Sequence, residues 1–389
     1  MAVVTETYPP EVNGVAATIS RVVAGLRQRG HDPALVRPRQ GPADRASAEG
    51  GAAEMLVRGL SIPRYPELRM GLPCRRALMR HWAMQRPDVV HLVTEGPLGW
   101  SALQAAARLG LPVVSDFRTN FHAYSSHYGV AWLRRPIMGY LRHFHNRTAA
   151  TMVPTDALRG ELAAVGFERL RVVSRGVDTA LFDPARRSEA LRASWGVAPH
   201  GPVVLYVGRL ALEKNLGDLL AAFEAVRGVT PGACLVLVGD GPERASLQRR
   251  CPDAVFAGVR RGGDLAAHYA SADLFLFPSL TETFGNVTTE AMASGLPVVA
   301  FDCAGAAQLI ESGRNGMLAD RGDPAMMIRQ AVALAADRSL CRLIGERARL
   351  TACAQDWDGV ITRFEGVLEQ VIAAQADPLT LKGALPAPG

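Results

Sequence analysis

Lysine is almost missing from this chain of 389 residues, which has two lysines among its 43 basic residues. Lys382 lies in a tail rich in proline and glycine, so Lys214 is the one lysine that the sequence places inside a folded region. Arginine serves wherever general positive charge is enough. A retained lysine therefore predicts a site that needs a compact, rotatable ammonium group, and we expect Lys214 to have a function.

Long apolar runs and paired cysteines are missing as well. No uninterrupted apolar run approaches the roughly 18 residues that a membrane-spanning helix needs. The chain starts directly on an apolar strand without a basic segment or cleavage site, so we expect no secretory signal. The six cysteines show no zinc-type spacing, and scattered cysteines are typical of reduced core residues. These features predict a cytoplasmic protein.

Acidic residues are scarce in the first half of the chain. Residues 1–180 contain 23 arginines and 14 aspartates and glutamates, a net charge of +9, whereas the remainder has 20 basic and 23 acidic residues, a net charge of −3. This excess can attract anionic lipid, an acidic acceptor or nucleic acid, or it can be an arginine-rich solvated surface. The segment "CRRALMRHWAMQR", residues 74–86, fits either a helix lying on anionic lipid or an ordinary crossover helix.

Apolar strands alternate with amphipathic helices along most of the chain. The first strand, Ala2 to Thr5, precedes a loop and a helix with one apolar face, and the pattern restarts at "PVVLYVG" after a break rich in Gly, Asp and Pro. This alternation predicts an α/β protein with two facing Rossmann-like, doubly wound domains and an interdomain cleft. The expected parts are residues 1–182, residues 183–355, a terminal helix over 356–373 that crosses back to the first domain, and a flexible tail over 374–389.

The segment "FPSLTETFGNVTTEAMASG", residues 277–295, carries two glutamates eight residues apart. A buried strand precedes its loop, and a helix should begin near Asn286 and end at Gly295. Free backbone N–H groups at that helix start would form an anion site: those of Gly285, Asn286 and Val287. Glu282 in the loop and Glu290 on the helix would flank this site. Since carboxylates accept hydrogen bonds from sugar and ribose hydroxyls, the pattern predicts a nucleotide-sugar site.

The Glu-x7-Glu pattern in this context resembles the retaining glycosyltransferases of family 4, which have the GT-B fold. "GRLALEKNL", residues 208–216, resembles the diphosphate clamp of that family, and "PPEVNGVA" resembles its first loop. The motifs occur in family order over about residues 1–370. The wording of "TETFGNVTTEAMASG" and "NFHAYSSHYG" is most similar to bacterial GDP-mannose-dependent α-mannosyltransferases, and glycolipid-making relatives that use UDP-sugars share most of it.

The resemblance implies a role for each site residue. Glu282 would bind the donor hexose and Glu290 the ribose, while Arg209 and Lys214 would neutralise the diphosphate. The other donor-binding positions are Gly14 in the first loop, Val259 beside the base, and Phe284, Gly285, Asn286 and Val287 at the helix start. The family reaction retains the anomeric configuration and is drawn without a protein nucleophile. Because two cations and a helix dipole supply the electrostatic stabilisation, no metal and no cofactor is expected.

The sequence departs from the family pattern at Phe117-Arg118-Thr119, where many relatives carry an aromatic-His-Thr triplet. Arg118 has no acceptor nitrogen, so it cannot reproduce both roles of a neutral imidazole. We expect Arg118 to supply charge and His122, four residues later, to supply the imidazole contact; alternatively, His122 only packs in a loop. "DWD" at 356–358 formally matches a metal-binding Asp-x-Asp pair, but aspartate caps are routine at helix starts.

These patterns predict a retaining hexosyltransferase that transfers mannose from GDP-mannose to a lipid-linked or glycan acceptor. It would act in the cytoplasm, peripherally at the anionic inner face of the cell membrane, and would bind no nucleic acid. The alternatives are a UDP-sugar-dependent glycolipid glycosyltransferase, a sugar-nucleotide epimerase or phosphorylase on the same fold, and a non-catalytic nucleotide-binding scaffold. A phosphorylase would need another lysine for pyridoxal phosphate, and a scaffold would be expected to lose Lys214, Glu282 or Glu290.

Overall fold

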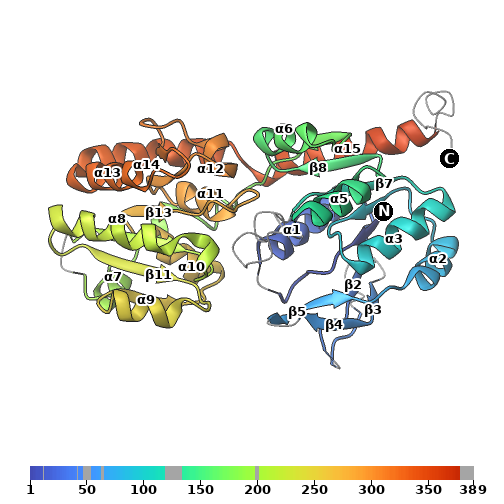
Figure 1. Cartoon of the computed structure of the whole chain (residues 1–389), viewed down its shortest axis with the longest axis horizontal. Coiled ribbons are helices and arrows are strands. Elements are labelled where there is room, and N and C mark those ends of the chain that lie inside the picture. Colours follow the sequence, from blue (N-terminus) through green and yellow to red (C-terminus); the bar gives the residue numbers. More distant parts are fainter. Residues whose placement is uncertain are drawn as a thin grey trace. The chain divides into compact units, whose positions relative to one another are not determined.

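The computed structural model describes residues 1–11, 13–41, 43–46, 54–62, 65–118, 134–197 and 201–376. The described residues form two compact units (Figure 1). Among the described residues, unit 1 contains those within 1–118, 134–174 and 357–376, and unit 2 contains those within 175–356. The contacts thus divide the main chain after Ser174, whereas the sequence placed the boundary after residue 182.

Unit 1 contains a parallel sheet of seven strands in the order β3-β2-β1-β6-β7-β8-β9. The strands are β1 (Ala2–Val4), β2 (Ala34–Pro38), β3 (Met55–Val57), β6 (Val90–Leu92), β7 (Val113–Asp116), β8 (Ala150–Val153) and β9 (Leu170–Val172). Val3 pairs with Leu35 on one side and with His91 on the other. The strand order therefore reverses between β1 and β6, which is the topological switch point of this sheet.

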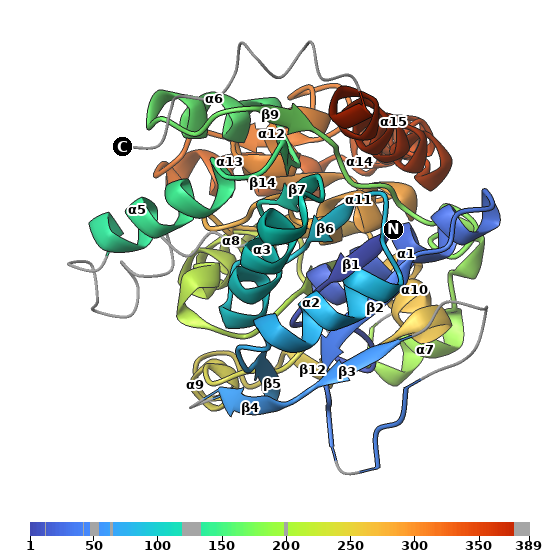
Figure 2. The same cartoon turned by 90° about the vertical axis from the view of Figure 1, so that its right-hand side faces the viewer.

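Helices and one hairpin complete unit 1. The helices are α1 (Gly14–Gln28), α2 (Arg75–Met84), α3 (Pro97–Leu109), α5 (Arg134–His145), α6 (Asp156–Ala164) and α15 (Trp357–Ala376). Helices α2 and α3 pack side by side (Figure 2). The antiparallel hairpin of β4 (Gly59–Ile62) and β5 (Tyr65–Gly71) was not predicted from the alternating pattern.

The last helix, α15, packs against α1, although more than 300 residues separate them. A Cβ atom at Gly25 would lie 2.0 Å from Cδ1 of Ile361, so the Ile361 side chain packs directly on the backbone of α1 at this glycine. Arg29 donates to Glu365 at 2.7 Å and to Asp358 at 2.6 Å. Helix α15 therefore closes the core of unit 1.

Unit 2 contains a parallel sheet of six strands in the order β12-β11-β10-β13-β14-β15. The strands are β10 (Val203–Val207), β11 (Cys234–Val238), β12 (Val255–Gly258), β13 (Leu274–Phe277), β14 (Val298–Phe301) and β15 (Met317–Ala319). Every residue of β10 is buried, as expected for a central strand covered on both faces. The order reverses between β10 and β13.

The helices of unit 2 lie on both faces of its sheet, because right-handed crossovers that run in opposite directions place their helices on opposite faces. Helix α8 packs with α13, and α11 packs with α10 and α14. The α-helices are α7 (Glu189–Ser194), α8 (Leu216–Val229), α9 (Arg244–Arg250), α10 (Gly262–Ala270), α11 (Asn286–Ala293), α12 (Ala304–Leu309), α13 (Pro324–Ala336) and α14 (Arg338–Cys353). Two short 3-10 helices are η2 (Pro184–Arg186) and η3 (Leu212–Lys214).

Two parallel, doubly wound α/β units confirm the predicted fold class. None of the helices described combines the length with the apolar character that crossing a membrane requires.

Candidate active site

Two loops of unit 2 meet at the switch point of its sheet. Residues 208–215 follow β10, and residues 278–285 follow β13. The two strands are parallel neighbours, with Val204 opposite Leu274 and Leu205 opposite Phe275. Their loops therefore leave the sheet at the same edge, where open α/β sheets bind ligands. The topology brings the predicted clamp and the predicted Glu-x7-Glu loop together.

Hydrogen bonds fix these two loops to one another. Asn215 has a left-handed backbone, with φ of 50°, and joins η3 to α8. Its Nδ2 donates to the carbonyl oxygen of Pro278 at 3.1 Å, and the Thr281 hydroxyl donates to the carbonyl oxygen of Glu213 at 3.1 Å. The backbone positions of Lys214 and Glu282 are thus set by bonds that do not involve either side chain.

Lys214 and Glu282 form an ion pair. The Lys214 ammonium donates to Oε1 of Glu282, and the Ser279 hydroxyl donates to the same oxygen at 2.7 Å. The side chains are 12% and 17% exposed, so water screens the pair only weakly. The sequence assigned Lys214 to the diphosphate and Glu282 to the hexose, and did not predict that the two would be partners.

Arg209 also has a carboxylate beside it. Its guanidinium lies 4.0 Å from Glu213, whose side chain is only 2% exposed, while the Arg209 side chain is 41% exposed. Below them, the buried Tyr206 hydroxyl donates to the carbonyl oxygen of Arg209 at 3.1 Å. Burial, together with the charges of Glu282 and Glu213, raises the pKa of Tyr206 well above its usual value. Neither Glu213 nor Tyr206 was predicted as a site residue from the sequence, although Glu213 directly precedes Lys214.

The loop after β10 rests on the glycine turn after β11. The backbone N–H of Leu210 donates to the carbonyl oxygen of Asp240 at 2.9 Å. Gly239 has φ of +135°, and a Cβ atom there would lie 1.9 Å from the carbonyl oxygen of Gly208. The turn of residues 239–241 therefore supports the backbone of the loop that carries Arg209.

Helix α11 starts where the sequence predicted. It runs from Asn286 to Ala293, with Gly285 as a left-handed N-cap at φ of 85°, and Gly295 follows it at φ of 77°. Within a helix, the first N–H groups have no partner, so those of Asn286 and Val287 are positioned to bind an anion. Phe284 is buried and anchors the loop, since its carbonyl oxygen accepts from Gly305 at 2.8 Å.

Glu290 lies on α11 and bonds to a tyrosine from α10. The Tyr269 hydroxyl donates to Oε2 of Glu290 at 2.9 Å. Burial raises the pKa of Glu290 to about 7, so it is close to half-ionised at neutral pH. Burial and the Glu290 charge raise the pKa of Tyr269 well above its usual value, which keeps the hydroxyl a donor. The sequence could not predict Tyr269 as a partner of Glu290, because the two residues meet only through the packing of α10 on α11.

The remaining predicted donor contact in unit 2 is Val259. It directly follows β12 at the carboxyl edge of the sheet and is 53% exposed. An exposed apolar residue at this edge is available to a flat base.

Unit 1 holds the other predicted residues. Gly14 is the first residue of α1, and the Asn13 side chain caps that helix by accepting from the Ala16 N–H at 2.8 Å. Arg118 is buried, and its Nε donates to Oδ2 of Asp116 at 2.6 Å. His91 Nε2 lies 2.9 Å from the same oxygen. The charge of Arg118 is therefore offset inside unit 1. His122 lies outside the described residues.

A partly buried carboxylate that the sequence did not reveal lies at the switch point of unit 1. Glu6 follows β1, and its Oε1 accepts from the Leu98 N–H at the start of α3 at 3.0 Å. A Cβ atom at Gly96 would lie 2.0 Å from Oε2 of Glu6, so the Glu6 carboxylate packs directly on the backbone of Gly96. Burial raises the pKa of Glu6 to about 7. Glu6 thus joins the first loop to the loop after β6.

Acidic and thiol ligands do not gather into a metal centre in the described parts of the chain, where no group of three or more His, Cys, Asp or Glu side chains could hold an ion. In the "DWD" segment, Asp358 pairs with Arg29 at 2.6 Å, and α15 begins at Trp357. Asp358 therefore has a structural partner in α1.

Comparisons with known proteins identify the family of the chain. The family profile "Glycosyltransferase Family 4" matches residues 12–181, and "Glycosyl transferases group 1" matches residues 201–337. The chain is 38% identical over 377 residues to a GDP-mannose-dependent alpha-mannosyltransferase of Mycobacterium tuberculosis, covering 95% of this chain and 96% of the relative. It is 38% identical over 380 residues to the Mycolicibacterium smegmatis protein of the same name, covering 95% and 97%.

Solved structures share the fold. A sucrose-phosphate synthase from Thermosynechococcus elongatus superposes with a TM-score of 0.80 at 19% identity, covering 96% of this chain and 99% of that one. At this identity the likeness concerns the fold alone.

Proposed function

Because the chain belongs to glycosyltransferase family 4 and is a hexosyltransferase, we propose that it transfers mannose from GDP-mannose to a lipid-linked or glycan acceptor and forms an α linkage. The observation that carries the proposal is the cluster at the switch point of unit 2. There, Lys214, Arg209 and Glu282 lie on the loops of neighbouring strands, beside the start of α11, the helix that carries Glu290.

Each group suits one part of the donor. Lys214 and Arg209 stabilise the diphosphate, and the first N–H groups of α11 add the positive end of a helix dipole. Glu290 accepts from the ribose hydroxyls, with Tyr269 holding its carboxylate. Glu282 accepts from hydroxyls of the hexose, and Val259 packs against the base.

The reaction exchanges one bond at the anomeric carbon for another on the same face of the sugar. The bond from C1 to the β-phosphate oxygen breaks, and a bond from the acceptor oxygen to C1 forms. The leaving phosphate takes the acceptor's proton. Negative charge grows on the diphosphate in the transition state, so cations already in position lower the barrier. Arg209 and Lys214 can do this without a resident metal or cofactor, and we expect EDTA to leave the transfer rate unchanged.

Donor choice is tested by thermal-shift and transfer measurements with GDP-mannose and UDP-glucose in parallel. We expect GDP-mannose to raise the melting temperature and to be consumed when an acceptor extract is added. Preference for UDP-glucose would replace the proposal by a UDP-sugar-dependent glycolipid transferase. Binding of both nucleotides without transfer or hydrolysis would indicate a nucleotide-binding scaffold.

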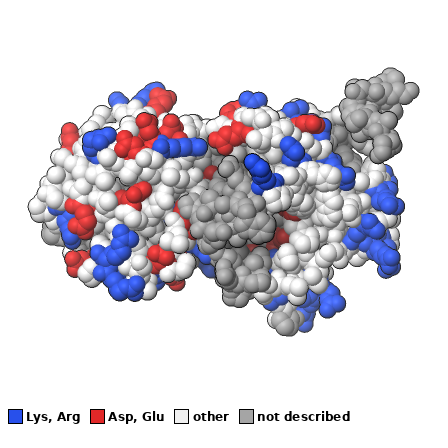
Figure 3. All heavy atoms as spheres, viewed as in Figure 1, with Lys and Arg blue, Asp and Glu red and all other residues white. Residues whose placement is uncertain are grey.

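The acceptor is proposed to lie at an anionic membrane surface, which the basic face of unit 1 would contact. Figure 3 shows basic side chains gathered on the part of unit 1 where α2 lies. Within the described part of the chain, Arg76 and Arg80 on α2 form no ion pair, and Arg75 donates to Gln104 at 3.2 Å. On the same helix, Met84 is 79% exposed. Unpaired arginines beside an exposed apolar side chain are typical of a membrane-surface helix.

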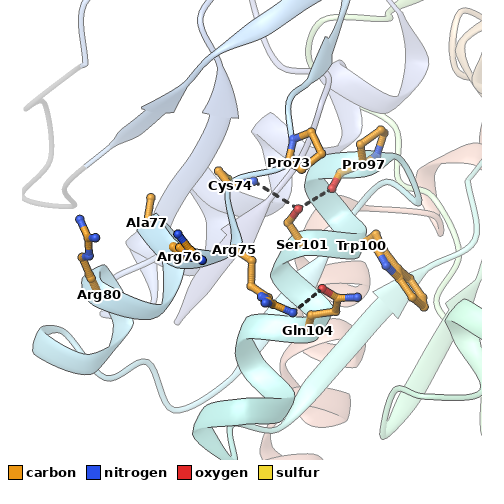
Figure 4. A pocket seen from close by; sticks show the side chains of 10 residues that line it. All are labelled: Pro73, Cys74, Arg75, Arg76, Ala77, Arg80, Pro97, Trp100, Ser101 and Gln104. Carbon is orange, nitrogen blue, oxygen red and sulfur yellow. Dashed lines mark hydrogen bonds between the residues drawn. The ribbon is translucent and has the colours of Figure 1, made fainter.

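A shallow pocket of about 600 Å³ lies between the starts of α2 and α3. Figure 4 shows its lining: Pro73, Cys74, Arg75, Arg76, Ala77, Arg80, Pro97, Trp100, Ser101 and Gln104. No carboxylate is among these residues, so the pocket favours anionic headgroups.

Co-sedimentation with vesicles tests this surface. We expect binding to vesicles that contain phosphatidylglycerol, a decrease as salt rises, and a loss in the Arg76→Ala/Arg80→Ala variant. The control Arg108→Ala/Arg171→Ala removes the same charge from unit 1 and should bind like the parent. Equal losses of vesicle binding in both variants would show that net charge, and not the α2 surface, causes the binding. No binding of the parent at low salt would favour a soluble acceptor.

A further inference from the structure

The cations assigned to the diphosphate are already matched by carboxylates. Lys214 donates to Glu282, and Arg209 lies 4.0 Å from Glu213. The four formal charges therefore sum to zero, so this group of side chains offers no surplus positive charge to an entering diphosphate. Either the diphosphate binds despite repulsion from two carboxylates, or one of these carboxylates leaves its cation when the diphosphate binds.

Glu282 is the carboxylate that can change partner. Only 2% of the Glu213 side chain is exposed, and the backbone carbonyl oxygen of Glu213 accepts a hydrogen bond from the Thr281 hydroxyl. Glu282 is more exposed, at 17%, and lies in the loop that leads into the helix start. Lys214 and Ser279 both donate to Oε1 of Glu282. Elsewhere in the described chain no donor reaches Oε2 of Glu282, so this oxygen can accept from a sugar hydroxyl without losing a bond.

We propose that Glu282 is an exchangeable counter-ion of Lys214, which holds the ammonium until the donor's diphosphate takes its place. The proposal rests on the function proposed above for the same site. Once the diphosphate pairs with Lys214, Glu282 keeps the Ser279 hydroxyl and turns its freed acceptor capacity to the hexose. The exchange couples binding of the diphosphate by Lys214 to binding of the hexose by Glu282. A nucleotide diphosphate alone displaces Glu282 from Lys214 and gives the carboxylate no new partner. The sugar of the complete donor supplies hydroxyl groups that bond to the displaced carboxylate.

This coupling predicts discrimination between the donor and the product. GDP must compete with Glu282 for Lys214, while GDP-mannose offers hydroxyl donors to Glu282 in return. Glu282 therefore weakens binding of the product nucleotide and favours its release after transfer. A residue that only contacts the hexose would not affect GDP binding.

The experiment is calorimetric titration of the full-length chain with GDP and with GDP-mannose. Glu282→Gln keeps the side-chain shape and removes the charge, so we expect GDP to bind about tenfold more tightly and the preference for GDP-mannose over GDP to shrink by a similar factor. Glu282→Asp shortens the side chain by one methylene and retains the charge, so it should also loosen the hold on Lys214 and tighten GDP binding, by about threefold. Thermal unfolding of each variant checks the fold.

Glu311→Gln is the matched control. It removes one carboxylate charge from unit 2, where Glu311 pairs with Arg314 on the surface, and it should leave the affinity for GDP unchanged. Unchanged or weaker GDP binding in both Glu282 variants would overturn the counter-ion role while leaving the transferase function intact. If the parent binds neither GDP nor UDP, the proposed function and this inference both fail.

Discussion

Replacing Lys214 by alanine tests the clamp most directly. Two unit charges 4 Å apart interact by about 4 kcal/mol at an effective dielectric constant of 20, and truncating one partner of a weakly solvated charge pair costs about 2–4 kcal/mol. The low exposure of Lys214 and Glu282 places this site in that regime. The variant also leaves Glu282 without its partner and close to the entering diphosphate, so repulsion adds to the loss.

We therefore expect Lys214→Ala to weaken GDP-mannose binding by at least thirtyfold, measured by calorimetry, and turnover to fall with it. Lys214→Arg should restore only part of the affinity, because a planar guanidinium does not reproduce the contacts of an ammonium group. Lys214→Ala/Glu282→Gln should bind better than Lys214→Ala, because the repelling carboxylate is gone. Donor binding by Lys214→Ala within threefold of the parent would refute the reasoning.

Four further predictions concern pH and packing. Donor affinity should rise by up to tenfold per pH unit as pH increases toward 7 and then level off, because ionised Glu290 is the better acceptor; Glu290→Gln should remove this dependence in calorimetric titrations. In the protein without donor, the raised pKa of Glu290 makes folding stability fall as pH rises. The stabilising contribution of Glu290 is full below the unfolded pKa near 4.5 and is lost as pH rises through about 7. Glu290→Gln should therefore flatten the pH dependence of the melting temperature over that window. Gly25→Ala should lower the free energy of unfolding by about 1–3 kcal/mol through the clash with Ile361, and Ile361→Ala should recover part of that loss in the same urea titration. Gly239→Ala should displace the carbonyl of Gly208 and reduce donor affinity more than it reduces the melting temperature; equal binding by parent and variant would contradict the support role of that turn.

The sequence was most informative where local chemistry decides the structure. Helix α11 begins at Asn286 because Gly285 supplies a left-handed cap, and Gly295 ends it in the same way, so both limits were readable from the residues. The alternation of strands and helices likewise predicted two doubly wound units. In the structure, β10 and β13 are neighbours, so the loop that carries Lys214 lies beside the loop that carries Glu282.

The partners of the site residues could not be read in this way. Tyr269 reaches Glu290 from another helix, and the pairing of Glu282 with Lys214 depends on the side-chain conformations of two loops 68 residues apart. The sequence likewise had no signal for the buried hydrogen bond from Arg118 to Asp116. Contacts of this kind arise from tertiary packing, for which a single sequence has no periodic signal.

The position of α15 has a consequence for how the protein is made. The first 174 residues emerge from the ribosome without Ile361 and Phe364, which complete the core beneath α1. Unit 2 lies between these two stretches, so its entire chain is synthesised while the apolar face of α1 still has no cover. Synthesis therefore completes unit 2 before unit 1, and a stop codon at position 357 would leave a chain with an intact second unit and a permanently open first one.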